Sequence, residues 1–246
     1  MVKLKVPTLQ HLARNWRETP EEICDTLVSL ARNSPTFNYN SLLAAARDLL
    51  VFHQPYDEVA DGIRRKVTRE DVRANLLSVL PLIRDHFQEI PDGFALSVAR
   101  RYYPVGRGLS VPFEPPMAYG GDGVLHLPWF SFWRQNPLRS KRLSLFMTIV
   151  DEILSQDPDL EQSDFHILDF SAPTAKSQRQ LRVVWAADVP RLSEDEKISM
   201  LETFAVGYSM AVDVLSGDKD GMAKSDAEAP DPRQGDLFDG LPASPA

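Results

Sequence analysis

The sequence has little of what small metal, redox or secreted sites are built from. It contains one cysteine, Cys24, which excludes an intramolecular disulfide framework and a multi-thiolate metal site. The five histidines show no i,i+4 pair or other spacing typical of zinc ligands. We therefore expect no metal and no cofactor, and a reducing compartment.

Signals for membranes and secretion are also missing. No uncharged apolar run approaches the roughly 18 residues that a membrane span needs. The first residues include two lysines, but the chain turns polar before any apolar signal-peptide core could form. These features predict a soluble, cytoplasmic protein without a membrane role.

Common catalytic and nucleotide-binding motifs are incomplete. The glycines at 106–108 and 120–123 lack the framing of either phosphate-binding glycine fingerprint, and we interpret both as turns. No serine stands in a Gly-x-Ser-x-Gly pattern. The sequence therefore offers no complete catalytic motif, and whether the protein is an enzyme is uncertain, with non-catalytic readings favoured.

Residues 1–90 are predicted to form a helical region. A threonine N-cap at Thr19, a proline at the next position and a glutamate three residues on make a capping box. Apolar residues at helical spacing predict helices over 19–32, 40–52, 55–66 and 68–80. Pro81 is expected to kink or end the last of these.

Residues 91–217 are predicted to form an α+β domain, a small and mostly antiparallel sheet packed with two helices. Alternating apolar residues predict an antiparallel meander with strands starting near Phe94, Gly108 and Val124. An amphipathic helix should follow over 138–155, then strands over 164–170 and 180–187, with Trp185 on the inward face. The capping box at 193–196 begins a helix that should stop at Gly217.

Residues 218–246 are predicted to be a disordered tail. From Ser216 onward there are three basic and seven acidic residues, a net charge of −4, and almost nothing apolar before Leu237. Such a segment cannot bury enough surface to offset the entropy of ordering it. Its isolated Leu-Phe pair therefore suggests a binding motif.

The tail sequence Gln234-Gly235-Asp236-Leu237-Phe238 resembles the pentapeptide with which many bacterial replication and repair proteins bind the sliding clamp. The resemblance covers five residues only. It implies that Gln234, Leu237 and Phe238, with Asp236 beside them, contact a groove on the clamp. No family is recognised for residues 1–217.

The middle of the chain is locally basic. Between residues 100 and 142, two acids, Glu114 and Asp122, stand against seven basic residues: Arg100, Arg101, Arg107, Arg134, Arg139, Lys141 and Arg142. The last four lie just before and within the first turn of a predicted helix, where they oppose the helix dipole and would favour a phosphate. Nearby aromatics, from Tyr102 to Trp133, are either core or a stacking surface for single strands. DNA or RNA is the ligand that we expect.

A metal-dependent nuclease is the alternative, because helix–strand–strand–strand–helix–strand over 68–170 is the element order of restriction-type nucleases. Such enzymes hold Mg²⁺ with strand carboxylates and place a lysine nearby. The acid-x-lysine pattern is missing from the central strands. The remaining candidates are Asp169, Lys176, Asp151 and Glu152, and for Asp169 a surface or helix-capping role is the expected alternative.

Three functional hypotheses follow. The first is a non-catalytic accessory protein of bacterial DNA replication, repair or mobile-element maintenance, tethered to the sliding clamp by its tail and touching nucleic acid through the basic residues. The second is a divalent-metal nuclease or phosphodiesterase with an atypical motif. The third is a protein–protein interaction module with no nucleic-acid role. The charge asymmetry favours the first.

Overall fold

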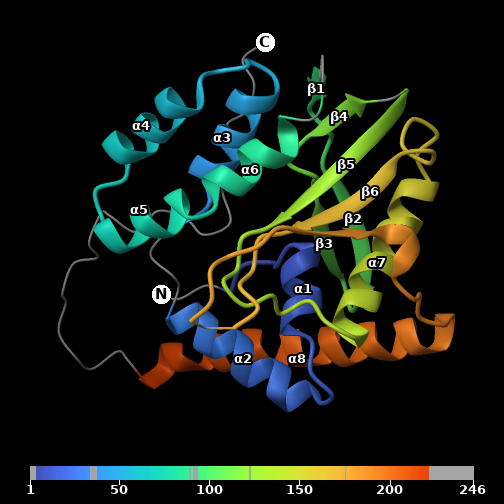
Figure 1. The fold of residues 1–246 in the computed structure, drawn as a ribbon. Helices are drawn as coiled ribbons and strands as arrows, with labels where there is room; N and C mark the ends of the chain where they lie inside the picture. The colour runs from blue at the N-terminus through green and yellow to red at the C-terminus, as the bar shows by residue number, and fades with distance from the viewer. Residues whose placement is uncertain are drawn as a thin grey trace, which may run out of the picture. The chain divides into compact units, whose positions relative to one another are not determined.

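The computed structural model describes residues 4–33, 38–88, 90, 94–121, 123–174 and 176–221 and has an α+β fold (Figure 1). It divides into two compact units, and each is made of separate stretches of the chain. Unit 1 comprises residues 1–38, 102–113 and 192–246, and unit 2 comprises 39–101 and 114–191. The sequence-based division at residue 90 follows chain order, whereas these units follow contacts.

Unit 2 is built on a five-stranded sheet in the order β1-β4-β5-β6-β7. The strands are β1 (Phe94–Leu96), β4 (Ala118–Gly121), β5 (Val124–Ser131), β6 (Asp164–Asp169) and β7 (Arg182–Trp185). β5 and β6 pair in parallel, and the other three pairings are antiparallel. The sheet is therefore mostly antiparallel, as predicted, with one parallel pair at its centre.

Helices cover both faces of this sheet (Figure 1). One face packs against α3 (Asn40–Leu50), α4 (Tyr56–Lys66), α5 (Glu70–Leu77) and α6 (Leu80–Phe87) in a core that includes Phe130, Phe132 and Phe170. On the other face lies α7 (Lys141–Ser155), whose Phe146 ring contacts Trp129 of β5 and Phe165 of β6. α7 connects the two parallel strands, since a parallel pair needs a crossover.

Unit 1 consists of α1 (Leu9–Asn15), α2 (Pro20–Arg32), the hairpin of β2 (Arg101–Gly106) and β3 (Leu109–Phe113), and α8 (Glu194–Gly221). α2 and α8 approach closely at Gly207. A Cβ atom there would stand 2.6 Å from the Pro20 carbonyl oxygen and 2.7 Å from the Ile23 Cβ. Only glycine allows this helix crossing.

Several predicted elements differ from the structure. α1, β2, β4 and α6 were not predicted, and Pro81 stands in the first turn of α6 rather than at the end of a helix. Proline is tolerated there because the first-turn N–H groups have no helical partner. Trp185 is 41% exposed rather than inward. α8 runs past Gly217 to Gly221 because an isolated glycine weakens a helix without ending it.

Part of α8, Glu194–Gly217, is long and apolar enough to cross a membrane by length and composition alone, although charged residues interrupt it. In the structure 39% of its most apolar window is buried, and the helix packs on α2. Core helices of soluble proteins pass the same test. The first residues of the predicted tail, 218–221, belong to α8, and the rest of it, with the motif at 234–238, lies outside the described residues.

Candidate nucleic-acid interface

The strands β5 and β6 end at the same edge of the sheet, and the chain leaves both ends in basic segments. Residues 132–142 follow β5, residues 170–182 follow β6, and together these segments hold seven basic residues and no acid. Six of these side chains are exposed or half-buried, and we call them the basic edge: Arg134, Arg139, Lys141, Arg142, Lys176 and Arg182. The carboxyl ends of parallel strands are where α/β sheets usually bind ligands.

Backbone hydrogen bonds hold the two segments together. The Phe170 N–H donates to the Ser131 carbonyl at 2.9 Å, and the Ala172 N–H donates to the Arg134 carbonyl at 2.8 Å. The Arg134 guanidinium also donates to the Ser177 carbonyl at 3.1 Å. These bonds join the segment after β5, at Arg134, to the segment that carries Lys176 and Arg182 some forty residues further along the chain.

Arg179, the seventh basic residue, is buried and ties this edge to the helical layer. Its guanidinium donates to the carbonyls of Phe132 and Phe170, at 3.0 and 2.8 Å, and to the side chain of Asn75 on α5 at 2.6 Å. Burial lowers the pKa of this guanidinium. Arg179 thus fixes the ends of both strands without presenting its charge to solvent.

Asp169, the leading catalytic candidate, lies at the carboxyl end of β6 and is only 2% exposed. The expectation of a surface or capping role was wrong. Its carboxylate accepts hydrogen bonds from Asn136 at 2.9 Å, from Arg182 at 3.0 Å and from the Ser171 N–H at 3.0 Å. This carboxylate is engaged in holding the loops of the basic edge.

The other nuclease candidates lie on other elements than Asp169, which ends β6. Asp151 and Glu152 lie in the middle of α7, where Asp151 pairs with Arg191, and Lys176 is exposed in the loop after β6. Among the described residues, no three His, Cys, Asp or Glu side chains are placed to hold a metal ion. The nuclease reading therefore gains no geometric support from these four residues.

The first turn of α7 follows the loop after β5 and is unusual in its charge. It contains Lys141 and Arg142 and no acid, and its N-cap, Ser140, makes no side-chain capping bond. Ser140 has a φ of 48°, in the left-handed region. The cations oppose the helix dipole, so this turn repels positive and attracts negative groups.

The remaining predicted cations are placed elsewhere. Arg100 pairs with Glu114 at 2.5 Å, and Arg101 pairs with Asp157, so both of these charges are met by acids in unit 2. Arg107 belongs to unit 1, in the turn between β2 and β3. The structure thus gathers four of the seven predicted basic residues and adds Lys176 and Arg182, which local charge counting missed.

Most of the aromatic residues proposed for stacking are core. Tyr103, Trp129, Phe130 and Phe132 are buried, and Tyr102 is exposed in unit 1. Trp133, half-buried, is the aromatic side chain that directly adjoins Arg134. The basic edge is therefore suited to phosphate groups more than to a stacked row of bases.

A second polar cluster lies toward the opposite ends of the same strands. His86, His126 and His166 come from α6, β5 and β6, and the His166 ring lies 6.4 Å from that of His86 and 6.0 Å from that of His126. Tyr119 stacks on His126 at 4.9 Å. Residues about forty positions apart meet here, which no sequence spacing indicated.

His166, in the middle of this cluster, is kept neutral by its surroundings. His166 is fully buried, and its burial, together with the two neighbouring imidazoles, lowers its pKa to about 4. Burial and the nearby Asp164 raise the pKa of Tyr119 to about 12. The nearest acid oxygen to His126 Nδ1 is that of Asp164 at 3.9 Å.

Comparison of the chain with protein-family models found no matching family, and comparison with curated proteins found no similar sequence. Function is therefore argued from the site alone.

Proposed function

We propose that this protein is a non-catalytic accessory protein of bacterial DNA replication, repair or mobile-element maintenance. It binds the phosphate backbone of DNA or RNA through the basic edge and is tethered to the sliding clamp by residues 234–238. The observation that carries the nucleic-acid half is the charge of the loops at the carboxyl ends of β5 and β6, where seven basic residues stand without an acid in a protein of net charge −8.

Several features support binding of these charges to the phosphate backbone of a nucleic acid, rather than a structural role for them. Six of the cations are exposed or half-buried, and Arg182, which pairs with the buried Asp169, still keeps 64% of its side chain exposed. The first turn of α7 adds an electrostatic preference for anions. The half-buried Trp133 offers at most limited stacking, which favours phosphate contacts that do not depend on sequence.

The nucleic-acid half is tested with a variant in which Arg134, Arg139, Lys141 and Arg142 are replaced by glutamine. Neutralising four phosphate contacts should reduce the slope of log affinity against log salt by about 3 to 4 and weaken binding at least about 100-fold in dilute salt. Fluorescence anisotropy with labelled single- and double-stranded oligonucleotides measures both quantities.

A matched control carries the same loss of charge elsewhere in unit 2: Arg64, Arg65, Lys66 and Arg84 to glutamine. It should retain most of the affinity and nearly the full salt slope. Equal weakening in both variants would mean that binding follows net charge and not the basic edge. No binding by the unmodified protein would refute this half outright.

The clamp half rests on the tail peptide and is tested separately. A peptide of residues 229–242 should bind purified bacterial sliding clamp, and Leu237→Ala with Phe238→Ala should abolish that binding, since the resemblance places both side chains in the clamp groove. Calorimetry or anisotropy measures the affinity. A peptide that shows no binding at high micromolar clamp concentration would refute the tether and leave the basic edge unaffected.

A further inference from the structure

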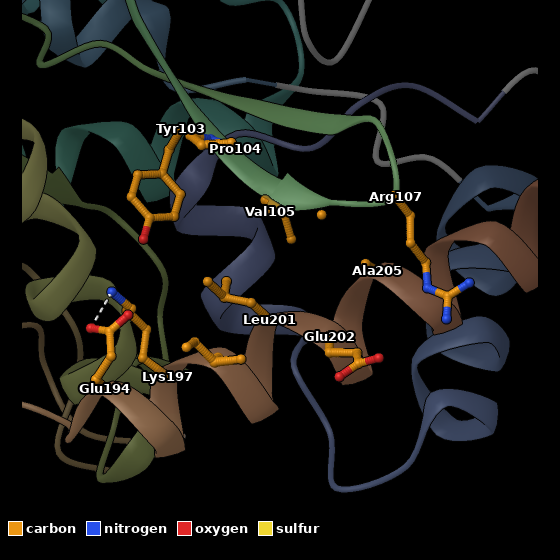
Figure 2. A pocket seen from close by; sticks show the side chains of 11 residues that line it. Tyr103, Pro104, Val105, Arg107, Glu194, Lys197, Leu201, Glu202 and Ala205 are labelled. Atoms are coloured by element: carbon orange, nitrogen blue, oxygen red, sulfur yellow. Dashed lines mark ion pairs between the residues drawn. The ribbon is translucent and has the colours of Figure 1, made fainter.

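A groove of about 520 Å³ lies within unit 1, between β2 and the first turns of α8 (Figure 2). Its middle is apolar and is formed by Val105 on β2 with Ile198 and Leu201 on α8. Ile198 is 52% exposed, whereas the other two side chains are buried. The groove thus presents an uncovered apolar side chain above an apolar floor.

Each end of the groove carries a cation, as Figure 2 shows. At one end Lys197, whose side chain is 7% exposed, pairs with Glu194 at 2.8 Å, and Glu194 itself is 68% exposed. At the other end stand Arg107, on the turn after β2, and Glu202, both exposed. A ligand with an apolar centre and an acid on each side would match this arrangement. One acid would take the place of Glu194 at Lys197, and the other would pair with Arg107.

The edge of β2 limits how such a ligand could bind. Pro104 lies in the middle of β2 and has no N–H to offer to an added strand. An occupant must therefore be held by its side chains, through apolar contact in the middle and charge at the ends. A short acid–apolar–apolar–acid peptide has the required pattern.

We propose that the occupant is residues 236–239 of the chain's own tail, Asp236-Leu237-Phe238-Asp239. Their order, acid, two apolar residues, acid, corresponds to the order of the groove, cation, apolar middle, cation. Leu237 and Phe238 cover Ile198, while the aspartates reach Lys197 and Arg107. Residues 222–246 hold few other large apolar side chains.

The length of chain beyond α8 is sufficient for this contact. The groove residues Lys197 to Ala205 lie about 24 to 36 Å from the helix end at Gly221, at 1.5 Å per residue. The fourteen residues from 222 to 235 span up to about 46 Å when extended. A flexible chain of that length has a root-mean-square span of about 21 Å, so its local concentration at the groove would be in the millimolar range.

Docking would hide the two residues that the proposed clamp motif needs. The clamp and the groove would then compete for Leu237 and Phe238, and the tail would be released only where the clamp concentration is high. The docking itself is independent of the proposed function, and only this regulatory consequence rests on it.

Limited trypsin cleavage of the full chain tests the docking without clamp or nucleic acid. The tail contains Arg233, which adjoins the proposed contact, and Lys224, which lies nearer to α8 and serves as an internal reference. The measured quantity is the initial cleavage rate at Arg233 divided by that at Lys224, from mass spectrometry. Ile198→Asp should raise this ratio about fivefold or more, because cleavage follows the population of the undocked tail.

The control is Val214→Asp, which places the same charge on another exposed apolar position of α8, outside the groove, and should leave the ratio unchanged. Leu237→Ala with Phe238→Ala should raise the ratio as Ile198→Asp does, and cannot disturb the packing of unit 1. A ratio that Ile198→Asp leaves unchanged would overturn the proposal. A ratio that changes on tenfold dilution would overturn it as well, because it would show docking between two copies.

Discussion

Toward the carboxyl ends of β5 and β6, the polar side chains are charged and exposed or half-buried, and they come from the connecting loops, the first turn of α7 and the start of β7. Toward the amino ends of the same strands the polar side chains are imidazoles, of which His166 is fully buried and neutral. The basic edge keeps its cations in water and uses one buried acid, Asp169, to hold the loops. The histidine cluster places His166 among aromatic rings, with no exposed surface.

The difference follows from what each end is attached to. Loops at the carboxyl ends can turn long cationic side chains outward, so their charge is retained at little desolvation cost. His166 lies on β6 and is fully buried beside His86 of α6, where charging its imidazole would require burying that charge. One end is therefore suited to meeting an anion, and the other responds to acid.

The largest expected effect concerns Arg179, whose buried side chain holds the chain just after β5 and β6, next to the basic edge. Arg179→Ala leaves the Phe132 and Phe170 carbonyls and the Asn75 side chain without their donor, and should lower the free energy of unfolding by about 4 kcal/mol. Urea unfolding followed by tryptophan fluorescence measures it.

Arg179→Lys serves as a comparison for the same position. It keeps the charge but lacks the guanidinium fork, so it should recover only part of the lost stability. A loss below about 1 kcal/mol in the alanine variant would show that the hydrogen bonds of Arg179 are not what holds the strand ends.

Substitution of Asp169 tests whether its carboxylate has a structural or a catalytic role. Asp169→Ala should lower the free energy of unfolding by about 3 kcal/mol, because it removes three hydrogen bonds and leaves Arg182 unpaired. Because water can hydrate the exposed Arg182 side chain, the loss of stability should lie at the low end of the range found when a buried ion pair is broken. Thermal and urea unfolding measure it.

The same residue tests the nuclease alternative. Incubation of the unmodified protein with DNA and Mg²⁺ or Mn²⁺ should give no cleavage. Cleavage that Asp169→Ala abolishes, while the Asp169→Asn variant remains folded and inactive, would replace the accessory role with the nuclease reading.

The local parts of this fold were predictable from sequence, and the long-range parts were not. Thr19 caps α2 by accepting a hydrogen bond from the Glu22 N–H at 3.3 Å, and the box of Ser193 and Glu196 caps α8, as predicted. These are contacts between residues three positions apart, so the chemistry that forms them is visible in the sequence.

Both clusters depend on strand pairing instead. The parallel register sets Ser131 opposite Asp169 and so joins two basic loops that lie about forty residues apart. Periodicity shows which face a residue occupies, but it does not show which strand is its neighbour. The polar, basic loop after β6 was the available signal for Lys176 and Arg182, and the three histidines carried none.

His166, which is buried near the amino ends of β5 and β6, should make the stability of unit 2 sensitive to acid. Its folded pKa of about 4 lies below the ordinary histidine value of 6.5, so the unfolded chain takes up a proton first as the pH falls. The stabilisation is therefore complete above pH 6.5 and is lost as the pH falls toward 4. Between pH 7.5 and 5 the loss is about 2 kcal/mol.

Urea unfolding at pH 7.5, 6 and 5 measures this loss. His166→Phe should flatten the dependence. His11, half-buried with a pKa lowered to about 4, lies in unit 1 and contributes a similar slope there, so His11→Gln is the comparison for the other unit. If His166→Phe and the unmodified protein lose stability in parallel, His166 is not responsible.

The smallest expected effect is at Ser131, which stands beside the acid of the charged end. Its side chain is fully buried, and its hydroxyl has no hydrogen-bond partner among the described residues. Ser131→Ala should change the free energy of unfolding by less than about 1 kcal/mol, because no bond is lost and an unsatisfied polar group is removed. Asn136→Ala, which removes bonds to Asp169 and to the Leu138 N–H, should cost about 2 kcal/mol. A Ser131 effect as large as that of Asn136 would mean that the hydroxyl takes part in the network that holds the basic edge.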